Sequence, residues 1–467
     1  MAQRTKESVS SHVQSECQVL QASPGLPFQH LLSEQRIVAA LGRAQVEFRE
    51  RIYTPMVTLW AFLTQVAASQ NGSCEDAVSR VLVDRLARGE RPCSTDTSSY
   101  CQARERLPEQ VCRELTQETG RGLHRQSLLQ WLWKGRPVAI VDGSTATMAD
   151  TEKNQEAYPQ HTNQQAGLGF PILRFVVLLS LSAGTVLECM IGPCHGKKTG
   201  EQSLFRQTWD ALQEGDILLG DRLYDAYRDI ALLKQRGVDC VLGKKQSRKV
   251  DFRQGRKLGP GDHVVVWKKP KYDASRYESR REWESLPEEM EMRQVRVTVR
   301  RHGYKTRQVV IVTTLLDGEV YSSRDLTDLF AQRWHCELDL RSIKRTLGMH
   351  HLRCKSPEMV RKELWTHLLA YNLIRIRMAQ AAAVHGVAPR TLSFSAAKTH
   401  MHNFAAASIY LSPDACHRME LELLRAIASS RVPERPGRKE PRAVKKRQQK
   451  YSFLTKPREQ ARQGLAA

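Results

Sequence analysis

The sequence predicts an α/β protein in which a mixed β-sheet carries helices on both faces. Short, continuous apolar runs begin after Pro137 and alternate with helical segments, as expected of strands that are buried in a sheet. Before residue 135, apolar residues recur every three or four positions, which indicates a separate helical region. Between residues 243 and 309 the apolar and polar residues alternate instead, which indicates a β-rich insertion.

The N-terminal region is predicted to be a helical, DNA-binding domain. Ser73 and Asp76 resemble the capping box of a helix that runs to about Ala87. Gly and Pro residues follow, and a second helix carries Arg104 and Arg106. A helix, a short break and a second helix that carries arginines are typical of DNA-binding helical domains. An ordinary helical bundle with solvated charges has the same pattern.

The segment after Pro137 has the order β-β-β-α-β-α-β, which is that of a ribonuclease-H-like domain. We expect its elements at residues 138–141, 172–181, 185–191, 202–212, 217–220, 227–235 and 238–242. The whole chain then divides into an N-terminal helical domain (1–135), a first part of the sheet domain (136–242), the β-rich insertion (243–309), a second part of the sheet domain with a long helix (310–390), and a C-terminal helical segment with a basic tail (391–467).

The charge of the chain points to a polyanionic partner. Lys and Arg number 72 against 50 Asp and Glu, so the formal net charge is +22. Nucleic acid neutralises such an excess through its phosphates. An anionic membrane is the rival, but no apolar span of about 20 residues is present, so we expect no membrane partner. No pair of cysteines has metal-site spacing, and we expect free thiols in a cytoplasmic protein.

Two aspartates follow apolar runs. Asp142 comes after residues 138–141 and Asp221 after residues 217–220. If these runs are neighbouring strands, both carboxylates emerge at one edge of the sheet, where they can share divalent cations. An Asp in such a place is also a common turn former and N-cap, so neither residue is diagnostic alone.

A helix predicted at residues 323–347 gives the aspartates a possible partner. It places Arg333, Glu337, Arg341 and Lys344 on one stripe, at i, i+4, i+8 and i+11. An apolar stripe lies beside it and would pack on the sheet, so Glu337 borders the buried face. Ordinary surface ion pairs have the same four-residue spacing, so this pattern is open to both interpretations.

The spacing Phe330-x₂-Arg333-x₃-Glu337-x₆-Lys344 resembles the Tyr-Arg-Glu-Lys signature of insertion-sequence transposases of family four, the cut-and-paste DDE class. Phe330 stands where that family usually has Tyr. Val141-Asp142-Gly143 resembles the family's first Asp motif, and Gly220-Asp221-Arg222-Leu223-Tyr224-Asp225 its second. The β-rich insertion and the basic C-terminal end fit the same family, and the similarity covers roughly residues 50–460.

The resemblance implies a DNA transposase that cuts at terminal inverted repeats and joins the ends to target DNA, through a hairpin intermediate. Asp142, Asp221 and Glu337 would then be the catalytic residues and the ligands of two Mg²⁺ ions, for which Mn²⁺ is expected to substitute. The partners would be DNA and a second copy of the chain, as a homodimer on paired ends within the bacterial nucleoid. The expected DNA-binding residues are Phe330, Arg333, Arg341 and Lys344, with Trp267 and Trp283 as candidates to stack on a flipped base.

Two other functions remain open at this point. A ribonuclease-H-like nuclease would use the same carboxylates to hydrolyse DNA without strand transfer. An inactive, DNA-binding derivative would keep the fold, although all three acidic positions are intact.

Overall fold

The computed structural model describes residues 31–48, 51–68, 72–275, 277, 279–299, 307–408, 412–433 and 452–463. The chain forms two compact units. Unit 1 consists of Met1–Pro137, Val177–Cys189 and His335–Val432, and unit 2 of Val138–Val176, Met190–Trp334 and Pro433–Ala467. Much of the predicted basic tail lies outside the described residues.

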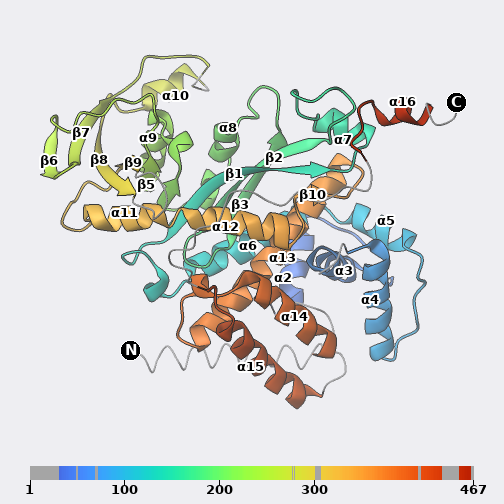
Figure 1. Cartoon of the computed structure of the whole chain (residues 1–467). Helices are drawn as coiled ribbons and strands as arrows, with labels where there is room; N and C mark the ends of the chain where they lie inside the picture. Colours follow the sequence, from blue (N-terminus) through green and yellow to red (C-terminus); the bar gives the residue numbers. More distant parts are fainter. Residues whose placement is uncertain are drawn as a thin grey trace. The chain divides into compact units, whose positions relative to one another are not determined.

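Unit 1 is mainly helical, and it gathers segments that are far apart in the sequence (Figure 1). Its helical elements are α2 (Glu34–Arg43), α3 (Pro55–Ala67), α4 (Cys74–Ala87), α5 (Ser98–Arg106), α6 (Glu109–Arg125), η1 (Leu129–Trp131), α12 (Trp334–Arg341, whose first residue belongs to unit 2), the π-helical turn η4 (Ser342–Thr346), α13 (Pro357–Val384), η5 (Pro389–Thr391), α14 (Phe394–Ser408) and α15 (Pro413–Ser429). The short strand β10 (His351–Leu352) precedes α13.

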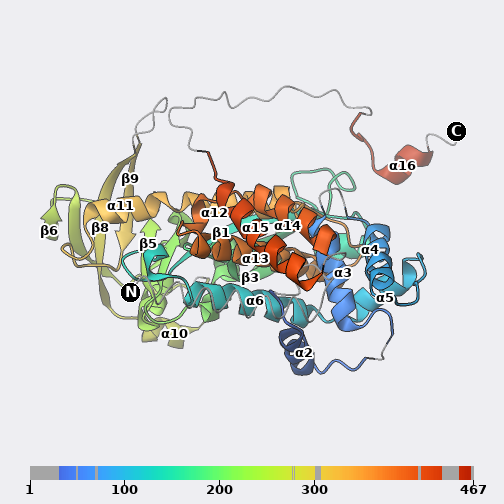
Figure 2. The same cartoon turned by 90° about the horizontal axis from the view of Figure 1, so that it is seen from below.

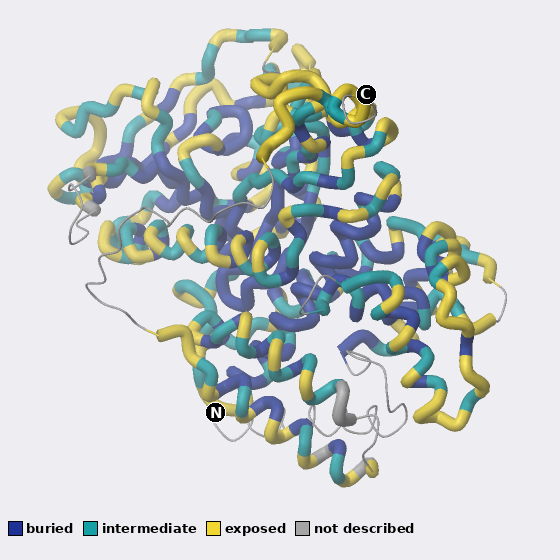
Figure 3. The backbone as a smooth tube through the Cα atoms, turned by 45° about the vertical axis from the view of Figure 1, so that its right-hand side comes forward, coloured by how far each residue is buried: buried dark blue, intermediate teal, exposed yellow. Residues whose placement is uncertain are grey.

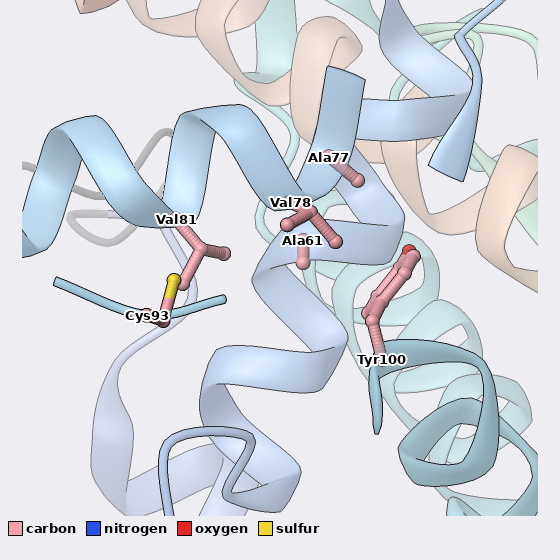
Figure 4. Packing of buried hydrophobic residues seen from close by; sticks show 6 residues of the cluster. All are labelled: Ala61, Ala77, Val78, Val81, Cys93 and Tyr100. Carbon is pink, nitrogen blue, oxygen red and sulfur yellow. The ribbon is translucent and has the colours of Figure 1, made fainter. Parts of the chain in front are cut away.

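The predicted start of α4 is confirmed, because the Ser73 hydroxyl accepts a hydrogen bond from the Asp76 N–H at 3.1 Å. Helices α3, α4 and α5 enclose a small core that includes Val78, Val81 and Tyr100 (Figure 4). The two arginines of α5 have different surroundings. Arg104 is only 9% exposed and donates to the side-chain oxygen of Gln65, whereas Arg106 is exposed. Arg104 therefore serves the core of unit 1.

Helix α13 is the central element of unit 1. It packs against α3, α6, α14 and α15, and it lies between α6 on one side and α14 and α15 on the other (Figures 1 and 2). Most of its residues are buried, which explains why its sequence lacks the one-sided polarity of a surface helix. None of the described helices is long and apolar enough to cross a membrane.

Unit 2 is built on the predicted mixed sheet, with the strand order β3-β2-β1-β4-β5-β9-β8-β7-β6. Strands β2 (Ile172–Ser180) and β3 (Val186–Pro193) extend from unit 2 into unit 1. The other strands are β1 (Val138–Met148), β4 (Ile217–Gly220), β5 (Asp239–Gly243), β6 (Arg256–Gly259), β7 (Asp262–Lys268), β8 (Glu289–Val299) and β9 (Arg307–Thr313). The helical elements are α7 (Glu152–Ala157), α8 (Glu201–Arg206), η2 (Trp209–Ala211), η3 (Arg222–Tyr224), α9 (Tyr227–Gln235), α10 (Arg280–Ser285), α11 (Ser323–Ala331) and α16 (Arg458–Gln463).

The pairing within this sheet confirms the predicted α/β class. Strands β1, β4 and β5 run parallel, and β9 joins β5 in the antiparallel direction. Strands β6, β7 and β8 lie within residues 243–309, the segment predicted to be β-rich, and pair antiparallel, and β8 pairs antiparallel with β9, which begins at the end of that segment. The buried runs follow the strands and inner helices, while loops and outer helix faces are exposed (Figure 3). Helices α9 and α11 pack on β5 and hold the sheet at the edge where the candidate site lies.

Candidate active site

The two aspartates occupy equivalent places on neighbouring elements of the sheet, Asp142 within β1 and Asp221 directly after β4. Ile140 of β1 pairs with Leu219 of β4, and each aspartate follows its partner of this pair by two residues. Because side chains alternate along a strand, Asp142 and Asp221 point to the same side of the sheet at the same level. The sequence expectation that both carboxylates meet at one edge therefore agrees with the register.

The surroundings of the two aspartates differ from expectation in one respect. Asp221 directly follows β4 and caps the turn η3, because its side chain accepts from the Leu223 N–H at 2.7 Å. Asp142 was predicted at the end of a strand but lies inside β1, which continues to Met148. The Asp142-Gly143 pair therefore does not turn the chain.

A further carboxylate, Glu201 of helix α8, lies against Gly143, the residue that follows Asp142 in β1. A Cβ atom added to Gly143 would lie 2.6 Å from the Glu201 Oε2 and 2.8 Å from its Cγ, so the Glu201 side chain lies directly over the backbone of β1. The hydroxyl of Tyr224 donates to the Glu201 Oε1 at 2.8 Å. Sequence reasoning missed Glu201, because no local pattern links a residue after β3 to Asp142. Tyr224 stood within the second motif but had no role assigned.

The electrostatics of this cluster favour binding of a cation. Burial above all, together with the negative charges of Glu201 and Asp221, raises the pKa of Asp142 to about 6, although the Gly143 N–H and the charge of Arg333 act to lower it. Burial and the same carboxylates raise the pKa of the Tyr224 hydroxyl, so it remains a donor. A bound cation would relieve the repulsion among these carboxylates.

Two residues of the predicted DNA-binding set lie in unit 2 near the aspartates. Arg333 interacts electrostatically with Asp142 and lowers its pKa. The ring of Phe330, at the end of α11, reaches the carboxyl end of β5, where its Cζ would lie 3.3 Å from a Cβ added to Gly243. The same added atom would lie 3.2 Å from the Arg222 nitrogen, so the Phe330 ring borders the backbone that follows Asp221.

The predicted single helix at residues 323–347 is wrong in detail. Helix α11 ends at Ala331, Gln332 and Arg333 form a turn, and α12 begins at Trp334. Helix α12 then passes into the π-helical turn η4. Arg333 consequently stands at the break, and the stripe expected from one uninterrupted helix is not continuous.

The other members of that stripe belong to unit 1. Glu337 is half-buried in the first turn of α12, Arg341 is exposed at its end, and Lys344 lies in η4. Burial and the neighbouring Arg345 lower the pKa of Lys344. π-Helical turns are rare in proteins, and those that occur are often found at functional sites. Lys344 thus lies in a type of turn that often accompanies such a site.

The two tryptophans of the insertion have different surroundings. Trp267 is only 6% exposed, and the Arg248 guanidinium lies 3.5 Å from its ring centroid, so its face is not open to a base in this conformation. Trp283 is half-buried, donates to the Pro270 carbonyl at 3.0 Å, and has the Lys269 ammonium 4.1 Å from its ring centroid. A cation therefore lies over each of the two rings, and Trp283 is the more exposed tryptophan.

The donor chemistry fits a hard divalent cation. Asp142 presents its carboxylate from β1 and Asp221 presents its own from the residue after the adjacent strand β4, and carboxylate oxygens are the ligand type that Mg²⁺ prefers. Within the part of the chain that the structure describes, no three Asp, Glu, His or Cys side chains are already arranged closely enough to hold an ion. The described cysteines are free thiols.

Comparison with known proteins identifies the family. The sequence profile of the transposase DDE domain matches residues 133–373. The chain is 28% identical over 424 residues to the transposase InsG for insertion sequence element IS4 of Escherichia coli (strain K12), covering 88% of this chain and 89% of that protein. A piggyBac transposase in a synaptic complex with hairpin DNA matches in structure with a TM-score of 0.43 and 10% identity, over 88% of this chain and 86% of that one. Since the profile match spans more than half of the sequence and includes both aspartates and Glu337, the chain belongs to the DDE transposases, enzymes that cut and transfer DNA strands.

Proposed function

We propose that this protein is the transposase of an insertion sequence, which cuts DNA at terminal inverted repeats and joins the ends to target DNA. The observation that carries the proposal is the register of β1 and β4, which brings Asp142 and Asp221 to one level of the sheet beside the charge of Arg333. The likeness to InsG along most of both chains supports the same reaction.

Asp142, Asp221 and Glu337 are the proposed metal ligands. Two Mg²⁺ ions, when bound, would stabilise the attacking and the leaving oxygen of an in-line displacement, and Mn²⁺ is expected to replace them. The part of the protein in this step is to hold the carboxylates on rigid strands and a helix, so that little reorganisation accompanies binding of the ions.

The cationic side chains are proposed to hold the DNA backbone. Arg333 can bind a phosphate with two parallel N–H donors, while Lys344 and Arg341 supply charge without that geometry. Phe330 cannot donate a hydrogen bond to a phosphate, as a Tyr would. We therefore expect weaker DNA contact at this position and retained activity.

A hairpin intermediate and a homodimer on paired ends complete the proposal. Trp283, with Lys269 over its ring, is the favoured platform for a base flipped out of the DNA end. Trp267 would first have to lose the cover of Arg248. The segment 1–135 is the proposed DNA-binding domain, with the exposed Arg106 as one of its contacts.

The substitution Glu337→Gln tests the assignment of the third carboxylate. Cleavage of inverted-repeat DNA should fall by more than the roughly 10- to 100-fold that is typical of groups outside the ligand set. DNA binding, measured by gel shift, should stay unchanged, because the amide has nearly the same shape. Glu284→Gln, in an exposed i,i+4 pair with Arg280, is the control. Full cleavage by Glu337→Gln would refute this role.

Strand transfer separates the transposase from the two alternatives. With precut ends, a transposase joins the 3′-OH to target DNA, whereas a nuclease of the same fold only hydrolyses. An inactive derivative would bind the ends and show no nicking with Mg²⁺ or Mn²⁺.

A further inference from the structure

Two cysteines of unit 1 lie with their sulfur atoms in contact. Cys74 is the first residue of α4 and Cys101 lies in α5, and their Sγ atoms are 3.8 Å apart. Both residues are partly exposed, whereas Cys112 of the same unit is buried and packs as a small apolar side chain. The pair therefore lies at the border of the core, where it is in part open to small solutes.

Hydrogen-bond donors converge on the sulfur of Cys74. The Arg104 Nη2 donates to it at 3.5 Å and the Gln65 Nε2 at 3.8 Å, and the same Arg104 nitrogen lies 3.8 Å from the Cys101 Sγ. Burial raises the pKa of the Cys74 thiol, and both Arg104 and Gln65 act to lower it. These two donors stabilise a thiolate more than a thiol, and the thiolate is the form that reacts with oxidants.

Arg104 is held in this position by its own contacts. Its Nη1 donates to the Gln65 Oε1 at 3.1 Å, and the Tyr100 hydroxyl donates to the same oxygen at 2.7 Å. The guanidinium lies 4.9 Å from the ring centroids of both Phe62 and Tyr100. A purely structural pair of small side chains would serve this guanidinium better with hydroxyl oxygens, because a neutral thiol is a weak acceptor. Two sulfurs beside a fixed cation are instead the surroundings of a reactive thiol.

We propose that Cys74 and Cys101 are a modification site at which a hydroperoxide forms a disulfide between α4 and α5. The Cys74 thiolate attacks one peroxide oxygen, so that an S–O bond forms, the O–O bond breaks, and the leaving hydroxide takes up a proton to become water. The Cys101 thiolate then attacks the Cys74 sulfur, so that the S–S bond forms, the S–O bond breaks, and a second water leaves. Each sulfur loses one electron, and the peroxide is reduced. This inference does not depend on the proposed function.

The geometry demands a modest movement for this bond. The sulfurs must approach from 3.8 Å to a bond length of about 2.05 Å, which is a change of about 1.8 Å. Cys74 is the first residue of its helix, and the ends of helices open at little cost in free energy. The two cysteines are 27 positions apart, so a bond between them constrains the unfolded chain and stabilises the folded one.

The test is mass spectrometry of the full chain after treatment with hydrogen peroxide. Remaining thiols are blocked with N-ethylmaleimide, and the chain is digested with trypsin without reducing agent. We expect a peptide pair joined through Cys74 and Cys101, which dithiothreitol separates. Cys74→Ser and Cys101→Ser should each abolish the pair. The control is Cys194→Ser, which removes a partly exposed cysteine of unit 2 and should leave the rate of cross-linking at the wild-type value.

Thermal unfolding shows whether the disulfide belongs to the native fold. Peroxide should raise the melting temperature of the wild type by about 5–10 °C and leave that of the double Ser variant unchanged. The proposal would be overturned by a cross-link that forms only in urea, by Cys74 joined to Cys354 instead, or by a lower melting temperature after oxidation. Peroxide treatment that leaves both thiols open to N-ethylmaleimide would overturn it as well.

Discussion

Gly120 lies where helix α6 touches strand β3 in unit 1, and a single methyl group there should loosen that unit. A Cβ at Gly120 would fall on the carbonyl oxygen of Val186, 2.8 Å from its carbon and 2.9 Å from the Asn372 Nδ2. Ordinary contacts between carbon atoms are about 3.5–4.0 Å, so the helix must move by about 1 Å. Gly120→Ala therefore displaces α6 from the strand.

This displacement breaks a buried hydrogen-bond set centred on Asn372. Its Oδ1 accepts from the Val186 N–H at 2.7 Å, and its Nδ2 donates to the carbonyls of Val186 and Thr116, each at 2.9 Å. A shift of about 1 Å takes these bonds past the limit of useful geometry. The three lost hydrogen bonds cost about 1 kcal/mol each, and overpacking costs about 1–3 kcal/mol more. The better helix propensity of Ala returns less than about 1 kcal/mol, so the free energy of unfolding should fall by about 3–5 kcal/mol.

The assay is thermal unfolding of the full chain, and the same helix provides the control. Nothing lies within 4 Å of a Cβ added to Gly122, so Gly122→Ala should stabilise the helix by about 0.5–1 kcal/mol. At about 2–4 °C per kcal/mol, Gly120→Ala should lower the melting temperature by about 10 °C while Gly122→Ala raises it slightly. Equal melting temperatures of the two variants would refute the reasoning. Asn372→Ala should cost nearly as much alone and little more when it is combined with Gly120→Ala.

Two further predictions concern buried titratable groups in unit 1. Asp339 is fully buried between Arg375 and Arg390, so Asp339→Asn should lower the free energy of unfolding, measured in urea, by about 3–5 kcal/mol. Asp328→Asn, in an exposed pair with Arg324, should lower it by less than about 1 kcal/mol. Comparable losses in the two variants would contradict the role of burial. Burial and nearby cations lower the pKa of His367 to about 3, below its value of about 6.5 in the unfolded chain, so between pH 6.5 and 3 the unfolded state binds the extra proton. Acidification from pH 7 to 5 should thus lower the free energy of unfolding by about 2 kcal/mol, and His367→Met should remove that share of the pH dependence.

Much of unit 2 follows from local sequence signals. The apolar run before Asp221 and the periodic helix over Tyr227–Gln235 are properties of neighbouring residues, and the structure has them at the predicted places. The equivalent positions of Asp142 and Asp221 along the sheet follow from the parallel pairing of two such apolar runs. The continuation of β1 through Asp142-Gly143 is a different case, because this strand also pairs with β2 and β10, and pairing with other strands is not visible in the dipeptide itself.

The features that sequence reasoning missed depend on contacts between distant residues. Glu201 and Tyr224 are 23 residues apart, and no periodicity connects them. The break at Gln332 and Arg333 carries neither Gly nor Pro, so nothing local marks it. The guanidinium that lies over Trp267 belongs to Arg248, a residue outside the strand of Trp267.

The division of unit 1 into three chain segments has a consequence during synthesis. Its first segment ends at Pro137 and its last at Val432, with most of unit 2 encoded between them. At translation rates of about 5–20 residues per second, the first helices wait about 15–60 s for α13, which fills their centre. A prematurely terminated chain that lacks α13 would expose the apolar faces of α3 and α6 to proteases. Incomplete chains would therefore be more open to proteolysis than the complete chain.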